Sequence, residues 1–441
     1  MSRVLILIDT TTLPHLVSGQ PPVAPFSHDR NLFQFAHEAL RRGDVVLFTA
    51  AQGDARKRAN WRVRQVYPTW EQDPELVAFS ELQPHIVVAV FPEALNVRSI
   101  FPHPKIVAIH AAIHWIESPE RFSAQYVFDL ITAVRYNIDF ILTQNERMAE
   151  VLAVVYNLLA KWPMRDRIIV APLGIVEEER RTIADRPGVR AEMGLEPDDI
   201  AIINSGGVWR WTDFNNFLAA FGEHVEARSG GMAHIKLFVM GLLQPTNCDH
   251  ADYIAETERL LHRFSGQLGD DIVAFNDWAD AGRRVKAYTA ASDIGLNVNT
   301  STLENWQSYR LRALDYMYFG LPVINTTGDM LSAMAGGRHA FVVEPGDVRG
   351  YRDVIDAIAR EPGQIAQRSD AMRTLAKDFD SRNTYGRALE TIAATPRRPA
   401  GDHAKWGDCV LDYANGRAAE DFRARLQRGV ARLADDLLAP A

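Results

Sequence analysis

The feature that most constrains this chain is a regular alternation between short apolar runs and longer amphipathic stretches. The first apolar run, residues 4–8, has no polar position, which is typical of a strand buried on both faces of a parallel sheet. The amphipathic stretch 28–42 begins after Ser27, a residue type that commonly caps helices, and ends before Gly43. Strands and helices that alternate in this way predict an α/β fold with parallel sheets.

The alternation occurs in two successive series, which the turn Ala171-Pro172-Leu173-Gly174 separates. The expected strands of the first series are residues 4–8, 45–48, 86–90, 106–109, 140–142 and 168–170; those of the second are 200–204, 235–240, 272–275, 294–298, 322–325 and 341–343. We therefore predict two Rossmann-like domains facing across a cleft, formed by residues 1–174 and 175–395. Residues 396–441 form a linker and a C-terminal helix with an apolar stripe, which we expect to pack back on the domains.

Composition narrows the classes of protein that this chain can belong to. Its 441 residues carry a formal net charge of −8, which disfavours nucleic acid as a partner because such binding depends on neutralising phosphates. No apolar stretch approaches the roughly 18 residues of a membrane span. The two cysteines, Cys248 and Cys409, lie far apart, as is typical of a reducing compartment. We expect a cytoplasmic protein; a homodimer is compatible with the sequence.

Several motifs of cofactor and metal chemistry are absent from the sequence. Neither the glycine pattern of dinucleotide binding nor the phosphate loop of ATPases follows an expected strand. His110 and His114 have the spacing of a metal-binding pair on a helix, but Ala111 stands where that motif has glutamate. The acidic pair around Asp378 ends a charged helical stretch rather than a strand. We therefore predict neither a metal nor a bound cofactor.

The most informative segment lies in the second domain. A polar loop over residues 301–309 leads into a helix that contains Arg310 and Arg312, and this helix ends at Gly320 before the next strand. Helix N-termini with serine, threonine, glutamine and arginine nearby are typical of phosphate sites, because the backbone N–H groups and the side chains all attract an anion.

This segment resembles the signature of the GT-B glycosyltransferases, specifically family 4, the retaining "group 1" sugar transferases. That signature is Glu, seven residues, Glu, then Gly-x-Pro and a strand; the same spacing here falls on Gln307 and Asp315, followed by Gly320-Leu321-Pro322. Gly206-Gly207-Val208-Trp209, Asn276-Asp277-Trp278 and Gly328-Asp329 are similar in order to motifs of exopolysaccharide-cluster members. The resemblance covers residues 165–360 and implies a nucleotide-diphosphate sugar held mainly by the second domain.

The resemblance assigns the donor site residue by residue. Asp315 would accept hydrogen bonds from the ribose hydroxyls, although an ion pair with Arg312 is an alternative role. Gln307, with Ser308 beside it, would face the sugar hydroxyls, or would instead bond to the backbone. Arg210, Arg310 and Arg312 would neutralise the diphosphate, because the lysine that the family places after the Gly207 loop is missing. Gly241 and Trp278 lie where the base should bind.

The first domain contributes fewer candidates. His110 follows an expected strand and would contact the sugar C6 hydroxyl or manage the acceptor proton. Ser18 and Gly19 lie in the loop after the first strand, on the expected acceptor side, where glycine permits a close approach of the backbone. A structural histidine and an ordinary turn glycine are the alternatives for His110 and Gly19.

Together these residues predict a retaining, hexosyltransferase-like enzyme with catalytic roles for His110, Arg210 and Arg310. The acceptor is expected to be a small soluble metabolite of a natural-product pathway. Three alternatives remain open: a transferase that builds an exopolysaccharide or lipid-linked glycan, a sugar-nucleotide epimerase of the same fold, and a non-catalytic nucleotide-sugar binding protein.

Overall fold

The computed structural model describes residues 2–8, 27–50, 83–90, 103–110, 134, 137–160, 164–175, 185–228, 230–241, 251–268, 271–275, 278–308 and 310–398. These residues form two compact units, which the chain connects between Gly174 and Ile175 and again between Asp380 and Ser381. Unit 1 contains the described residues up to Gly174 and those from Ser381 onward, and unit 2 contains the rest.

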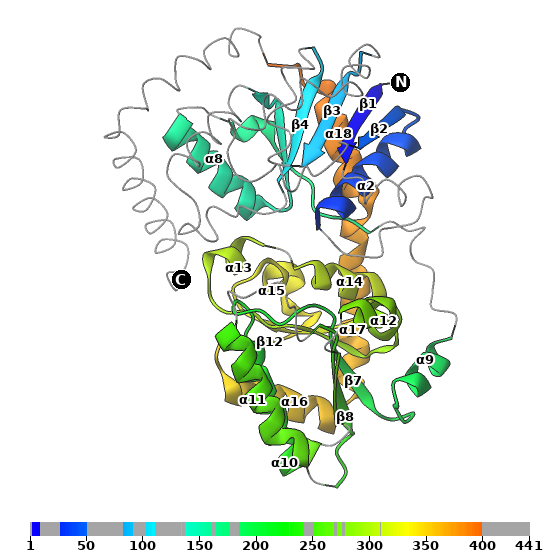
Figure 1. The fold of residues 1–441 in the computed structure, drawn as a ribbon, viewed down its shortest axis with the longest axis vertical. Helices are drawn as coiled ribbons and strands as arrows, with labels where there is room; N and C mark the ends of the chain where they lie inside the picture. Colours follow the sequence, from blue (N-terminus) through cyan, green and yellow to red (C-terminus); the bar gives the residue numbers. More distant parts are fainter. Residues whose placement is uncertain are drawn as a thin grey trace. The chain divides into compact units, whose positions relative to one another are not determined.

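Unit 1 is built on a parallel sheet with the strand order β2-β1-β3-β4-β5-β6 (Figure 1). Its strands are β1 (Arg3–Ile8), β2 (Val45–Ala50), β3 (Ile86–Val90), β4 (Lys105–His110), β5 (Phe140–Thr143) and β6 (Ile168–Val170). Its helices before the second unit are α2 (Ser27–Arg41), α8 (Glu146–Ala160) and the short 3-10 turn η3 (Arg165–Arg167). Residues 106–109 of β4 and 140–142 of β5 are apolar and buried, because both faces of a parallel sheet are covered. The two strands pair in register with each other.

The chain returns to unit 1 after Asp380 through the π-helix η9 (Arg382–Gly386) and α18 (Arg387–Ala394). Their apolar stripe, which includes Tyr385, Leu389 and Ile392, belongs to the same buried cluster as Phe35 of α2. Residues 381–395 were predicted to belong to the second domain, whereas in the structure they belong to unit 1. An amphipathic helix adds to the core that its apolar face covers, and chain order alone does not show which core that is.

Hydrogen bonds fix the returning segment at both of its ends. Ser381 Oγ donates to Glu38 Oε1 over 2.6 Å. Lys105 Nζ donates to the carbonyl of Ile392 over 2.6 Å, so that an ammonium group caps the C-terminal end of α18. Arg398, only 5% exposed, donates through Nη1 to the carbonyl of Ile138 over 2.8 Å. The helix expected within residues 396–441 lies outside the described residues.

Unit 2 is built on a second parallel sheet with the order β12-β11-β10-β7-β8-β9. Its strands are β7 (Ile200–Asn204), β8 (Ile235–Val239), β9 (Ile272–Ala274), β10 (Ile294–Asn297), β11 (Val323–Thr326) and β12 (Ala340–Val343). Its helical elements are α9 (Arg186–Glu192), α10 (Phe214–Ala227), α11 (Ala251–Leu268), α12 (Trp278–Ala291), α13 (Leu303–Gln307), α14 (Leu311–Phe319), α15 (Met330–Ala333), η7 (Met334–Gly337), α16 (Val348–Arg360), α17 (Gly363–Ala376) and η8 (Lys377–Phe379).

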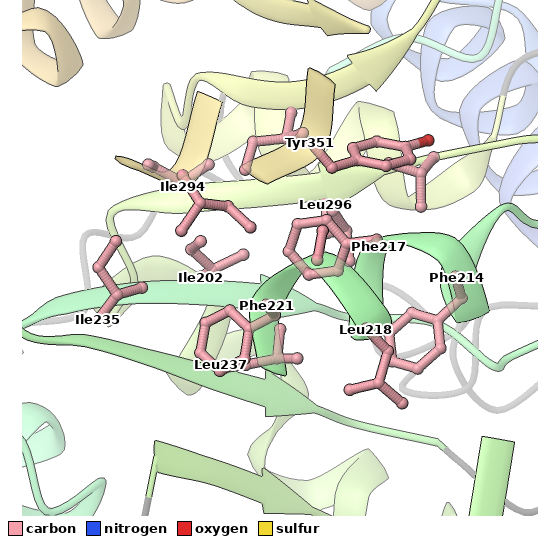
Figure 2. Packing of buried hydrophobic residues seen from close by; sticks show 14 of the residues in the cluster. Ile202, Phe214, Phe217, Leu218, Phe221, Ile235, Leu237, Ile294, Leu296 and Tyr351 are labelled. Carbon is pink, nitrogen blue, oxygen red and sulfur yellow. The ribbon is translucent and has the colours of Figure 1, made fainter. Parts of the chain in front are cut away.

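The helices of unit 2 cover both faces of its sheet. Figure 1 shows α10, α11 and α16 together on one face, and α12, α14 and α17 on the other. Figure 2 shows Phe217 and Phe221 pointing from α10 toward strand residues such as Leu296 and Leu237. Phe217 meets the ring of Tyr351 of α16 edge to face, with 5.8 Å between ring centroids. This packing confirms the predicted α/β class with parallel sheets.

The expected strands all form, each within two residues of its predicted bounds. Among the described helices, none combines the length and the apolar character that crossing a bilayer requires.

Candidate functional site

The strand order of unit 2 defines one place where a ligand is expected. After β7 the chain adds β8 and β9 on one side, and it then returns to place β10 on the other side of β7. Open parallel sheets bind their ligands in the crevice expected at such a reversal, which here falls at the carboxyl ends of β7 and β10. The loop after β7 contains Ser205, Gly206 and Gly207, and the loop after β10 contains Asn299 and leads to α13.

The first turn of α14 places a guanidinium group against the loop after β7. Arg312 donates through Nη1 to Oδ1 of Asn204 and through Nη2 to the carbonyl of Gly207, the latter over 3.1 Å. A Cβ atom at Gly206 would lie 3.1 Å from Nε of Arg312, so the absence of a side chain lets the guanidinium approach. Gly207 and Arg312, both assigned to the donor site from the sequence, are thus in direct contact.

The charge of Arg312 is desolvated and has only neutral acceptors. Within the described residues Arg312 forms no ion pair with a carboxylate. Burial lowers its pKa from 12.5 to about 10, while the nearby Tyr316 opposes that shift. At neutral pH the guanidinium therefore remains protonated, and a bound anion would supply the charge that the protein does not.

Tyr316 fixes α14 beneath the same crevice. Its hydroxyl donates to the carbonyl of Ile203 over 2.9 Å and accepts from the backbone N–H of Ser205 over 3.1 Å. The ring packs on β10 at Gly295, where a Cβ atom would lie 2.5 Å from the ring. Gly320 ends the helix with φ of 69°, the left-handed conformation that a helix C-terminus commonly needs.

Arg310, directly before α14, already has an anionic partner. Its Nη1 donates to Oε1 of Glu304 over 2.7 Å, its Nη2 donates to the other carboxylate oxygen, and its Nε donates to Oδ1 of Asn299 over 3.2 Å. The two side chains of the ion pair are 14% and 18% exposed. The charge of Arg310 is therefore balanced within the protein, in contrast to that of Arg312.

Arg210 lies at the tip of a tight turn and is exposed. The turn closes where the N–H of Thr212 donates to the carbonyl of Trp209 over 2.8 Å, and the indoles of Trp209 and Trp211 stack with 5.0 Å between centroids. Asp213 anchors the turn, because its Oδ2 accepts from the hydroxyl of Tyr351 over 2.7 Å. Arg210 is therefore a positively charged residue shortly after Gly206 and Gly207 of the loop that follows β7.

Gln307, Ser308 and Asp315 occupy the segment between β10 and β11. Gln307 ends α13 and is completely buried, and Ser308 follows in extended conformation. Asp315 lies on α14 and is half-buried. The ion pair considered between Asp315 and Arg312 is not formed, because the guanidinium turns instead toward Asn204 and Gly207. The ribose contact of Asp315 and the sugar contact of Gln307 stay predictions.

The predicted base site is only partly described. Gly241 follows β8, and the N–H of Met240 donates to the carbonyl of Asn204 over 3.0 Å, which brings this strand end beside the crevice. Trp278 begins α12, and Asn276 and Asp277 lie outside the described residues. Base contacts of Gly241 and Trp278 stay predictions.

His110 is the last residue of β4 in unit 1, as expected. It pairs in register with Thr143 of β5 and is only 1% exposed. Ser18, Gly19 and His114 lie outside the described residues. Across the parts of the chain that the structure describes, no group of three or more histidine, cysteine or acidic side chains is arranged to hold a metal ion, and Asp378 is exposed on η8.

No role was predicted for the polar side chains at and after the strand ends, although Gly328-Asp329 was noted as a motif. Asn204 ends β7, Asn297 ends β10, and Asn325 and Asp329 lie within and after β11, all at most 4% exposed. The sequence does contain a signal for these side chains, because the apolar runs of β7, β10 and β11 are each followed by polar residues, whereas a strand buried along its whole length would have apolar residues there. Glu304 had no comparable signal.

Comparison with known proteins bears on the fold. No protein-family model matches the chain, and no curated protein matches it in sequence. One similar solved structure is sucrose-phosphate synthase from Thermosynechococcus elongatus, with a TM-score of 0.61 and 12% identity over 89% of this chain and 98% of that one. A second is HepE from Anabaena with UDP-glucose, with a TM-score of 0.60 and 14% identity over 90% of this chain and 100% of that one. A third is a glycosyltransferase from Rickettsia africae, with a TM-score of 0.58 and 11% identity over 90% of this chain and 99% of that one. Such neighbours are GT-B glycosyltransferases, so the chain has the GT-B fold with Rossmann-like domains.

Proposed function

We propose that this chain is a glycosyltransferase that moves a sugar from a nucleoside-diphosphate donor to an acceptor. The observation that carries the proposal is the protonated, half-buried Arg312, held by Asn204 and Gly207 where the strand order of unit 2 reverses. A diphosphate is an anion of suitable size and charge for this position, beside the N-terminus of α14. The similar HepE structure contains UDP-glucose, which supports a uridine nucleotide as the first donor to test.

The proposed roles within the donor site combine the contacts described above with the resemblance to family 4. Arg312 and the exposed Arg210 would neutralise the diphosphate, while Arg310, balanced by Glu304, would hold the connector between α13 and α14 in place. Gln307 would contact the sugar, with Ser308 next to it, and Asp315 would contact the ribose. Gly241 and Trp278 would border the base. This assignment moves the main electrostatic role from Arg310 to Arg312.

We propose that transfer proceeds with retention of configuration, as in family 4. The bond between the sugar C1 and the diphosphate oxygen breaks, and its electron pair leaves with the diphosphate. The acceptor hydroxyl oxygen forms the new bond to C1 on the same face, and its proton passes to the departing phosphate oxygen. Fixed positive charge lowers the barrier because negative charge grows on the leaving group. His110 and the Ser18–Gly19 loop would serve the acceptor side, for a small soluble metabolite.

A thermal-shift screen tests the class of ligand. UDP, ADP, GDP, CDP and TDP, each alone and as the glucose conjugate, are added to the full chain, and a ligand that binds only the folded protein raises its melting temperature. The proposal predicts stabilisation by at least one nucleoside diphosphate. If none of these compounds changes the melting temperature, the proposal is wrong.

Products separate transfer from the alternatives. The stabilising sugar nucleotide is incubated with the protein, first alone and then with a panel of hydroxylated acceptors. A new glycoside with retained anomeric configuration supports the proposal. An isomerised sugar nucleotide without any acceptor indicates an epimerase, and an unchanged donor despite clear binding indicates a non-catalytic binding protein; either result contradicts it.

A further inference from the structure

A buried polar relay in unit 2 connects the end of β11 to the segment that carries the proposed donor site. It consists of Asp329, Asn299, Arg310 and Glu304, taken in the order of their contacts. None of these contacts lies between residues adjacent in sequence, so the relay is a product of the fold. The inference below rests on the proposed function, because its readout is nucleotide affinity.

Asp329 is the acceptor at one end of the relay. Its Oδ1 accepts from Nδ2 of Asn325 over 3.0 Å and from the N–H of Ser332 over 2.7 Å. Its Oδ2 accepts from Nδ2 of Asn297 over 2.9 Å and from Nδ2 of Asn299 over 3.4 Å. The carboxylate is 4% exposed. Three amide groups at the ends of two adjacent strands thus converge on one buried anion.

Asn299 connects Asp329 to Arg310, which lies in the connector between α13 and α14. Its backbone N–H donates to Oγ1 of Thr326 over 2.9 Å, and with its Nδ2 directed toward Asp329, its Oδ1 is oriented to accept from Nε of Arg310. An amide has one donating and one accepting side, so the two acceptors of Nδ2, which are the carboxylate of Asp329 and the carbonyl of Asn297 at 3.3 Å, determine which side faces the arginine. Rotation of the amide would present a donor to a donor and lose both contacts.

Arg310 then fixes α13 through its two contacts with Glu304. The guanidinium also lies over the ring of Trp211, with 6.0 Å between its carbon and the ring centroid. Gln307 and Ser308 lie between Glu304 and Arg310 in sequence, so this ion pair closes a short loop around them. The position of the proposed sugar-contacting residues therefore depends on the orientation of Arg310.

We propose that Asp329 is a positioning residue for the donor site, acting through Asn299 on Arg310 and Glu304. The carboxylate is costly to bury, and burial raises the pKa of Asp329 although hydrogen bonds from Ser332 and Asn325 and the charge of Arg310 lower it. Asparagine at position 329 would direct its own N–H₂ group at donors or lose one acceptor oxygen, whichever way it turned.

The test measures UDP-glucose affinity by calorimetry for the full chain and for Asp329→Asn, Glu304→Gln and the double variant, because UDP-glucose carries the sugar that Gln307 would contact. Each single change should weaken UDP-glucose binding by about tenfold, the loss expected when one preorganised contact set is disrupted. Because the two residues act in series, the double variant should be no weaker than the worse single variant. A purely structural role would instead lower the melting temperature and leave UDP-glucose affinity unchanged.

Asp356→Asn is the matched control. Asp356 lies in the same unit, accepts from Nδ1 of the buried His224 over 2.6 Å, and contacts none of the four relay residues. This variant should lose stability with unchanged UDP-glucose affinity. If Asp329→Asn is too unstable to measure, Glu304→Gln, at the half-buried end of the relay, still reports on it. Unchanged affinity in Glu304→Gln, or additive losses in the double variant, overturns the inference. If the wild-type chain binds neither UDP-glucose nor any other nucleoside diphosphate or its glucose conjugate, the proposed function fails first and the inference fails with it.

Discussion

At the scale of single residues, the difference between Arg310 and Arg312 shows what a motif leaves open. Arg310 directly precedes α14 and Arg312 lies in its first turn, and the sequence predicted similar phosphate-binding roles for them. The structure gives Arg310 a carboxylate partner and Arg312 only neutral acceptors. The distinction depends on Glu304 and Asn204, which are brought to these positions by α13 and β7. Spacing along the chain contains no such information.

Gly206→Ala tests the position of Arg312 without removing its charge. The new Cβ atom would lie 3.1 Å from Nε, so the guanidinium must shift by a few tenths of an ångström, which disturbs its contacts with Asn204 and Gly207. The side chain can yield at its far end, and we expect the free energy of unfolding to change by less than about 1 kcal/mol while UDP affinity falls by about tenfold. Calorimetry and urea unfolding measure the two quantities. Unchanged affinity would show that this contact does not serve the ligand.

Asp315→Ala tests the predicted ribose contact. Loss of two hydrogen bonds to the ribose should weaken nucleotide binding by roughly 1–3 kcal/mol. A comparison of UDP with 2′-deoxy-UDP supplies the control, because the alanine variant should discriminate less between them than the wild-type chain does. Equal discrimination in both proteins would argue against the ribose role.

At the scale of elements, the alternation of apolar runs and amphipathic stretches predicted the strands well, because a strand buried on both faces is apolar throughout. The same pattern could not assign α18 to a unit. Its stripe fits any apolar surface, and only the packed structure shows Tyr385 and Ile392 in the core of unit 1. The polar residues at the strand ends are likewise visible in the sequence, but the hydrogen bonds that join Asn297, Asn325 and Asp329 are not.

Tyr316→Phe tests how α14 is attached to the sheet. The hydroxyl contacts the backbone of Ile203, Ser205 and Leu296, so its removal leaves buried groups of β7 and β10 without a partner. We expect the free energy of unfolding to fall by roughly 1–3 kcal/mol. Tyr288→Phe is the control: its hydroxyl contacts the exposed Glu192, and a loss below about 0.5 kcal/mol is expected. If urea unfolding shows the same loss of unfolding free energy in Tyr316→Phe and Tyr288→Phe, the hydroxyl of Tyr316 does not attach α14 to the sheet.

At the scale of the whole molecule, the return of the chain to unit 1 depends in part on a buried carboxylate. Burial raises the pKa of Glu38, but hydrogen bonds from His37, Ser381 and Arg41 outweigh it and lower that pKa from 4.5 to about 2. The folded state therefore binds this proton more weakly than the unfolded state does. The resulting stabilisation is complete above the unfolded pKa of 4.5 and is lost as pH falls toward 2.

Glu38→Gln should remove this pH-dependent contribution. At neutral pH the shift corresponds to about 3 kcal/mol as an upper bound, since one pKa unit is about 1.4 kcal/mol. Urea unfolding of wild type and variant at pH 7, 5 and 3 should show a gap that narrows as the pH falls. A gap of the same size at every pH would show that packing, rather than the charge of Glu38, stabilises this attachment.

The central claim, a nucleoside diphosphate bound at the carboxyl ends of β7 and β10, is tested most directly by calorimetric titration of UDP into the full chain and into Arg312→Ala. Arg259→Ala, at an exposed arginine of α11, is the control. The account predicts saturable binding of one nucleotide per chain, an affinity at least about tenfold weaker in Arg312→Ala, and no change in Arg259→Ala. Absence of binding by UDP and by the other nucleoside diphosphates, or binding that is indifferent to Arg312, would contradict it.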